Sequence, residues 1–173
     1  MKEKTIVKYG CAMLAGGRGS RMGSVNKAEL EYGSMTFAGR IAGEMEKTGF
    51  PCYMSSAVYE QRIPEGWKQV KDCITDENGS YIGPMGGIYS FLMQAAEDGL
   101  EGLFFAPCDA PFYTVDAIDK LINLIGKDNH AAFWKSADGR IQTTFGWYSV
   151  RCLDCACWKQ QPDHLMRGGA PTH

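Results

Sequence analysis

Apolar residues along this chain fall into two recurring patterns: short unbroken runs, and stripes in which they recur every three or four positions. Unbroken runs are typical of strands buried on both faces, whereas stripes are typical of helices that cover one face of a sheet. Strand-like segments are predicted at 6–14, 52–57, 68–70, 103–106, 131–134 and 143–149. The stripes predict helices at about 35–48, from Ile88 to near Gly99, and from Thr114 to Ile125.

The strand-like and helix-like segments alternate along the chain, and no segment repeats. Such alternation is typical of a mostly parallel sheet with helices on both faces, because parallel neighbours are joined by helical crossovers. We therefore expect a three-layer α/β fold. Asp138-Gly139 between the last two strands is a turn sequence that suits a hairpin.

Size and charge narrow the classes of function. The 173 residues are 45% hydrophobic and 22% charged, which is ordinary for a globular domain. A net charge of −2 favours neither a nucleic acid nor an anionic membrane surface as a partner. No apolar run approaches the roughly 20 residues of a membrane span, and no apolar signal core follows the charged first residues, so we expect a cytoplasmic protein.

The chain contains seven cysteines, an odd number for a disulfide framework. Four are expected to be small buried side chains, as in a reducing cytoplasm: Cys11, Cys52, Cys73 and Cys108. Cys152, Cys155 and Cys157 form a Cys-x-x-Cys-x-Cys cluster. The cluster offers only three ligands, and the sequence shows no second group of ligands to complete a metal site. We therefore expect these cysteines to be thiols without a metal-binding role.

The most distinctive segment follows the first expected strand and reads Leu14-Ala15-Gly16-Gly17, then Arg21-Met22-Gly23, then Lys27. Its glycines let the backbone approach a ligand closely, and exposed N–H groups in such a loop can cradle phosphate oxygens. Arg18, Arg21 and Lys27 add positive charge. The spacing excludes a Walker loop and also a dinucleotide fingerprint, which needs Gly where Met22 stands. The segment predicts a binding loop for the phosphates of a nucleoside triphosphate.

Three further features are expected at the same edge, because ligands in open α/β sheets bind beyond the carboxyl ends of the strands. Pro107-Cys108-Asp109-Ala110-Pro111 follows a buried strand, and its carboxylate suits Mg²⁺, with a turn-capping Asp as the plain alternative. Gly83-Pro84-Met85-Gly86-Gly87 opens a helix and permits close approach to a base or phosphate, or is a plain turn. Asp72 ends the third strand, where it accepts hydrogen bonds from a ribose or base or is simply solvated.

In order and approximate spacing, these motifs closely resemble those of the molybdenum cofactor guanylyltransferase family (molybdopterin-guanine dinucleotide biosynthesis protein A) over about residues 6–150. The resemblance implies a nucleotide-diphospho-sugar transferase-like, Rossmann-like fold. It implies a nucleotidyltransferase domain at 1–150 and an atypical tail, truncated or disordered, at 151–173. The implied reaction transfers GMP from GTP to the phosphate of molybdenum-molybdopterin, with Mg²⁺ as cofactor. The implied partners are GTP, the molybdopterin cofactor, and cofactor-delivery or acceptor molybdoenzyme proteins, with no nucleic acid and no membrane.

The resemblance also assigns roles to individual residues. The implied catalytic residues are Arg21, Lys27 and Asp109, of which Asp109 is the metal ligand. The implied nucleotide-binding residues are Leu14, Ala15, Gly16, Gly17, Lys27, Ser55, Asp72, Gly83, Gly86 and Asp109.

The chain departs from the family at two places that bear on function. Ser55 stands where related enzymes place an Asn in the guanine site, and the family's further helix, strand and Asn-x-Asn-Thr-Pro-type motif are missing after position 150. Three alternatives therefore remain open: the cytidylyltransferase for the same cofactor, a sugar-phosphate nucleotidyltransferase, and a non-catalytic nucleotide-binding partner protein.

Overall fold

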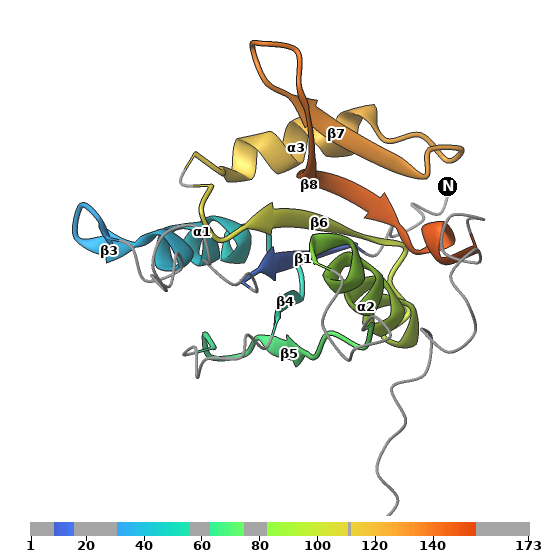
Figure 1. Cartoon of the computed structure of the whole chain (residues 1–173), viewed down its shortest axis with the longest axis horizontal. Helices are drawn as coiled ribbons and strands as arrows, with labels where there is room; N and C mark the ends of the chain where they lie inside the picture. Colours follow the sequence, from blue (N-terminus) through green and yellow to red (C-terminus); the bar gives the residue numbers. More distant parts are fainter. Residues whose placement is uncertain (1–8, 16–30, 56–62, 75–82, 111, 155–173) are drawn as a thin grey trace, which may run out of the picture.

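The computed structural model describes residues 9–15, 31–55, 63–74, 83–110 and 112–154 (Figure 1). Its centre is a six-stranded sheet with the order β5-β4-β1-β6-β8-β7. The strands are β1 (Tyr9–Leu14), β4 (Cys52–Ser55), β5 (Lys68–Val70), β6 (Gly102–Pro107), β7 (Ala131–Lys135) and β8 (Ile141–Ser149). Each of the six predicted strands is present, and the first is described from Tyr9 onward.

The sheet is parallel over four strands and antiparallel over the other two. β1 runs parallel to β4 on one side and to β6 on the other, and β5 extends the sheet in parallel beyond β4. β8 pairs antiparallel with β6, and β7 pairs antiparallel with β8. The expected mostly parallel α/β sheet is confirmed, and so is the final hairpin, in whose turn Gly139 has a φ of 87°.

Helices cover both faces of the sheet, as predicted (Figure 1). They are α1 (Phe37–Glu46), α2 (Pro84–Glu97) and α3 (Val115–Leu124). Alternate residues of β1 enter two separate cores, because successive side chains of a strand point to opposite faces. Cys11 and Met13 pack in one core with α1 and α3, and Ala12 and Leu14 pack in the other with α2.

The helix ends follow local sequence signals. Thr114 caps α3 as predicted, with its hydroxyl accepting from the Ala117 N–H at 3.3 Å. The first helix begins at Phe37 rather than near 35, because Met35–Thr36 form β3, which pairs with β2 (Glu31–Tyr32). The two-residue strands of this β2–β3 hairpin are too short to leave an alternating pattern, so the sequence did not predict them.

The cysteine prediction is confirmed for Cys11, Cys52 and Cys108, which are buried, and is wrong for Cys73, which is exposed. Cys73 lies beyond the end of β5, where Ile74 rather than Cys73 supplies the buried side chain. Cys152 is buried in a 3-10 helix at Val150–Asp154, which spans the domain boundary expected at position 150, and that boundary stays a prediction. Cys155 and Cys157 lie outside the described residues. No helix in the described part of the chain is long and apolar enough to cross a membrane.

Candidate functional site

The carboxyl ends of the four parallel strands meet at one edge of the sheet. Leu14 at the end of β1 is in register with Pro107 at the end of β6, and Ser55 of β4 is in register with Val70 of β5. After β1, the next two strands of the large sheet, β4 and β5, are added on one side of β1, and β6 is then added on the opposite side of β1. The order of the strands therefore reverses at β1, which is where open α/β sheets bind ligands.

Two backbone groups at the end of β1 are held by neighbouring strands. The Leu14 carbonyl accepts from the Cys108 N–H at 3.1 Å, and the Ala15 N–H donates to the Ser55 hydroxyl at 2.9 Å. The segment that leads into the glycines is thus fixed from both sides. The candidates that follow it, Gly16, Gly17, Arg21 and Lys27, lie outside the described residues.

Asp109 lies two residues beyond β6 in a short turn and is exposed. The Ala110 N–H donates to the Pro107 carbonyl at 3.2 Å, and the Tyr113 N–H donates to the Ala110 carbonyl at 3.1 Å. Tyr113 is 1% exposed and anchors the far side of the turn in the core. The fold thus presents this carboxylate at the edge of the sheet beside the end of β1.

The described residues hold no cluster of three or more His, Cys, Asp or Glu side chains arranged for a metal ion. A single exposed carboxylate such as that of Asp109 suits a cation such as Mg²⁺, which takes one or two protein carboxylates and completes its shell with phosphate oxygens and water.

The first turn of α2 lies against the end of β1. A Cβ at Gly87 would stand 3.5 Å from Leu14 Cδ2, so the helix start and the strand end are in direct contact. Gly83 precedes the helix with a φ of 86° and a ψ of −160°, a conformation that is essentially restricted to glycine. The position offers no capping side chain, and Gly86 is buried behind it. This arrangement brings the Gly83–Gly87 motif to the site, as the sequence predicts.

Asp72 lies just beyond β5 and is half-buried. Its Oδ1 accepts from the Ile74 N–H at 3.1 Å and from the Ser90 hydroxyl at 3.2 Å. Burial raises the pKa of this carboxyl above its usual value, and the two hydrogen bonds oppose that rise. Ser90, on α2, was not among the site residues predicted from the sequence. The signal was a small polar residue between the apolar positions Ile88 and Phe91 of a buried helix face.

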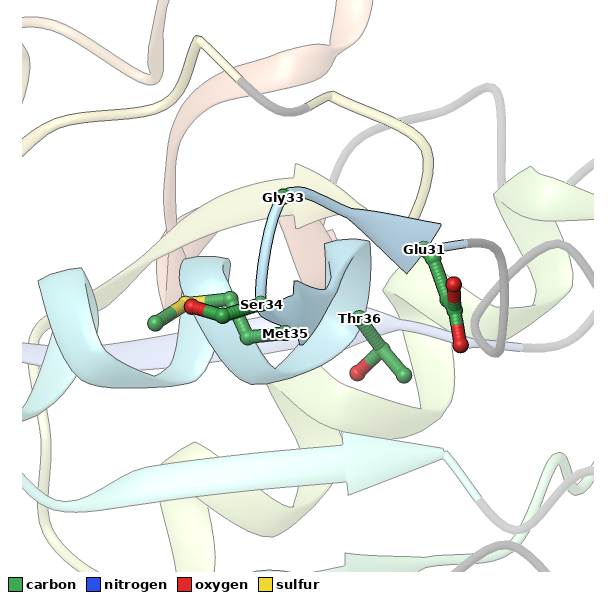
Figure 2. Close-up of a pocket in the computed structure, with 5 residues that line it drawn as sticks. All are labelled: Glu31, Gly33, Ser34, Met35 and Thr36. Atoms are coloured by element: carbon green, nitrogen blue, oxygen red, sulfur yellow. The ribbon is translucent and has the colours of Figure 1, made fainter.

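Five residues of the β2–β3 hairpin line a pocket of their own, shown in Figure 2: Glu31, Gly33, Ser34, Met35 and Thr36. In Figure 1 the hairpin lies beyond the end of the sheet toward which β1 and β6 point. None of these residues belongs to a motif that the sequence predicts as functional. Among the described residues that line the pocket, Glu31 carries the one ionisable side chain.

Together, a sheet whose order reverses at β1, a glycine-rich sequence after that strand, and aspartates after β5 and β6 define an α/β nucleotide-binding protein. The sequence model of the MobA-like NTP transferase domain family matches residues 11–163. The chain therefore belongs to this family of nucleotidyltransferases.

Curated relatives carry a more specific name. The molybdenum cofactor guanylyltransferase of Cereibacter sphaeroides is 30% identical over 163 residues, covering 93% of this chain and 80% of its own length. The one of Vibrio campbellii is 26% identical over 141 residues, covering 82% of this chain and 68% of its own length. The match to the one of Photobacterium profundum covers only 58% of that protein.

Solved structures share the fold. The Mycobacterium sp. strain JC1 homologue of Rv0371c superposes with a TM-score of 0.66 at 22% identity, over 90% of this chain and 76% of its own. Rv0371c of Mycobacterium tuberculosis, solved in complex with manganese, superposes with a TM-score of 0.59 at 18% identity, over 86% of this chain and 74% of its own.

Proposed function

We propose that this protein transfers GMP from GTP to the phosphate of molybdenum-molybdopterin, giving molybdopterin guanine dinucleotide and pyrophosphate. The observation that carries the proposal is that Leu14, Ser55, Asp72 and Asp109 all lie at or just beyond the carboxyl ends of the four parallel strands. The curated relatives named molybdenum cofactor guanylyltransferase support the choice of GTP and of this acceptor.

The nucleotide is proposed to lie across the carboxyl ends of β1, β4 and β5. Leu14 and Ala15 present the start of the glycine-rich segment, and that segment's N–H groups receive the triphosphate. Asp72 accepts a hydrogen bond from the nucleoside, and the first turn of α2 at Gly83–Gly87 lets the ligand approach the backbone closely. Ser55 is proposed to contact the nucleotide from the end of β4.

In the transfer step, an oxygen of the acceptor's terminal phosphate bonds to the α-phosphorus of GTP. The bond from the α-phosphorus to the bridging oxygen breaks on the opposite side, and its electron pair leaves with pyrophosphate. The acceptor phosphate is already anionic near neutral pH, so the step needs no general base. Arg21 and Lys27 are proposed to stabilise the charge on the departing pyrophosphate.

Asp109 is proposed to hold the divalent cation. A bound cation supplies neutralisation of the charge on the triphosphate. The sequence predicts Mg²⁺, and Rv0371c was solved with manganese, so both ions belong in the assay. Delivery and acceptor proteins as partners, and a cytoplasmic location, stay predictions.

The test is isothermal titration of the full chain with GTP, CTP, ATP and UTP, each with Mg²⁺, together with transfer of labelled GMP to molybdopterin. We expect GTP to bind most tightly and to support transfer. Equal affinity for GTP and CTP would remove the guanylyl assignment and favour the cytidylyl alternative. Tight GTP binding without transfer would favour the non-catalytic alternative.

A further inference from the structure

Ser90 is one of two buried polar residues among those the structure describes, the other being Ser149. It lies on α2, one turn after the Gly83–Gly87 motif, and is 4% exposed. A buried hydroxyl costs free energy unless it is hydrogen-bonded, so its partners show what holds it there.

The Ser90 hydroxyl joins the helix to the segment that follows β5. Its oxygen accepts from the Cys73 N–H at 2.9 Å. It lies 2.9 Å from the Gly86 carbonyl, 3.1 Å from Cys73 Sγ and 3.2 Å from Asp72 Oδ1, and each of these can receive its single proton. An ionised carboxylate is the strongest acceptor of the three.

A serine within a helix commonly bonds the carbonyl four residues earlier, which here is that of Gly86. That bond alone would give Ser90 only a local role. The additional contacts with Cys73 and Asp72 cross from α2 to a different segment, and they fix the Asp72 carboxyl relative to the helix start.

The two hydrogen bonds that described residues make to the Asp72 carboxyl both end on Oδ1, from Ile74 and Ser90. This leaves Oδ2 for a donor on the ligand. We propose that Ser90 is a positioning residue that orients Asp72 toward a hydrogen-bond donor of the bound nucleoside. The donor is a ribose hydroxyl or the guanine 2-amino group. The inference rests on the proposed function, in which Asp72 contacts the nucleoside of GTP.

The test is a double-mutant cycle on the full chain with Ser90→Ala, Asp72→Ala and the double variant. The readouts are GTP affinity by titration calorimetry and melting temperature. Ser149→Ala is the matched control, because Ser149 is equally buried but its hydroxyl donates to the Glu101 carbonyl at the opposite edge of the sheet. We expect Ser90→Ala to weaken GTP binding roughly tenfold, the size for loss of a hydrogen bond to a charged group. Ser149→Ala should leave the affinity unchanged.

If Ser90 acts through Asp72, the double variant binds GTP as Asp72→Ala does. Additive losses in the double variant would overturn the inference, as would an unchanged affinity in Ser90→Ala. If wild type binds GTP but Asp72→Ala binds it equally well, the nucleoside role of Asp72 fails and the inference fails with it. If no nucleotide binds to the wild type, the proposed function itself is wrong.

Two analogues identify the donor and separate positioning from general loosening. Dideoxy-GTP lacks the ribose hydroxyls, and ITP lacks the 2-amino group. We expect wild type to bind one of the two analogues more weakly than GTP. In Ser90→Ala the affinity for GTP should fall while the affinity for that analogue stays the same, so that most of the discrimination is lost. Discrimination that is unchanged in Ser90→Ala would assign Ser90 a structural role only and overturn the inference.

Discussion

The Ala15 backbone N–H donates to the Ser55 side chain at 2.9 Å, so the end of β4 holds the residue that enters the glycine-rich segment. Ser55 stands at the position where the resemblance predicts an Asn for the guanine. In this chain its oxygen accepts from the backbone, which leaves its hydroxyl proton and a second lone pair for a ligand.

Replacing Ser55 should therefore loosen the start of the glycine-rich segment, and so weaken nucleotide binding in general rather than the preference for one base. We expect Ser55→Ala to weaken binding of GTP and CTP alike, by about fivefold, since a typical hydrogen bond contributes about 1 kcal/mol. Ser55→Thr, which keeps the hydroxyl, is the matched control. Calorimetry with both nucleotides gives the answer, and a loss confined to GTP would make Ser55 a base-recognition residue instead.

Asp109→Asn should abolish most turnover and leave the fold intact. The amide keeps the shape of the side chain but lacks the charge that holds a cation. We expect a loss of about 100-fold or more in kcat, the order seen when one charge-stabilising group is removed from an active site. Asp128→Asn is the control, because Asp128 is exposed in the turn after α3, at the other end of the sheet. Full activity of Asp109→Asn with unchanged metal dependence would place the cation elsewhere.

Lys27→Ala should lower kcat more than it raises KM. A cation near the leaving pyrophosphate interacts most strongly as negative charge develops there, and such an interaction appears in kcat. Lys47→Ala provides the comparison, since Lys47 is an exposed residue at the end of α1 that pairs with Glu44 at 2.6 Å. Steady-state kinetics separate the two constants, and an effect on KM alone would make Lys27 a ground-state anchor.

The contribution of Asp72 to the free energy of unfolding should be less favourable at neutral pH than at mildly acidic pH. Burial raises the pKa of its carboxyl above the usual 3.8, so the native state binds this proton more tightly than the unfolded state does. The free energy of unfolding therefore falls as the pH rises through the raised pKa. We expect Asp72→Asn to melt at a higher temperature than wild type at pH 7, with a difference that shrinks toward pH 4. A difference that grows as the pH falls would contradict the burial argument.

Gly83→Ala should destabilise the protein through backbone strain alone. Among the described residues, chain neighbours aside, no atom lies within 4 Å of a Cβ built at Gly83, but its φ of 86° is one that L residues rarely adopt. We expect a loss of about 1–3 kcal/mol in the free energy of unfolding. Gly43 on α1 is a matched control: it has equally open space and a helical backbone, so Gly43→Ala should stabilise by up to about 1 kcal/mol. Denaturant unfolding of both variants measures these changes in the free energy of unfolding, which should be negative for Gly83→Ala and positive for Gly43→Ala.

The sequence predicted the elements whose signals are local. The apolar stripe of α3 and its cap at Thr114 are confirmed, as are the buried strand β6 and the turn at Gly139. The β2–β3 hairpin was missed because strands of two residues cannot display a period of two.

For the site, the sequence predicted which strand ends and loops meet, but not the contacts between them. Ser55 was expected to face the nucleotide, and its bond to Ala15 depends on the register between β1 and β4. Ser90 reaches Asp72 across eighteen positions of sequence, and no spacing rule connects a helix residue to the end of a strand. Such contacts are set by tertiary packing rather than by local pattern.

The central place of β1 also bears on how the chain folds during synthesis. β1 emerges from the ribosome before either of its neighbours, and its partner β6 follows only after α1, β4, β5 and α2. The apolar segment from Cys11 to Leu14 thus stays without its second neighbour for most of translation, and pairings of such sequence separation close slowly. β1 is therefore the strand that waits longest for its second partner during synthesis, and until β6 appears its unpaired edge is open to other pairings.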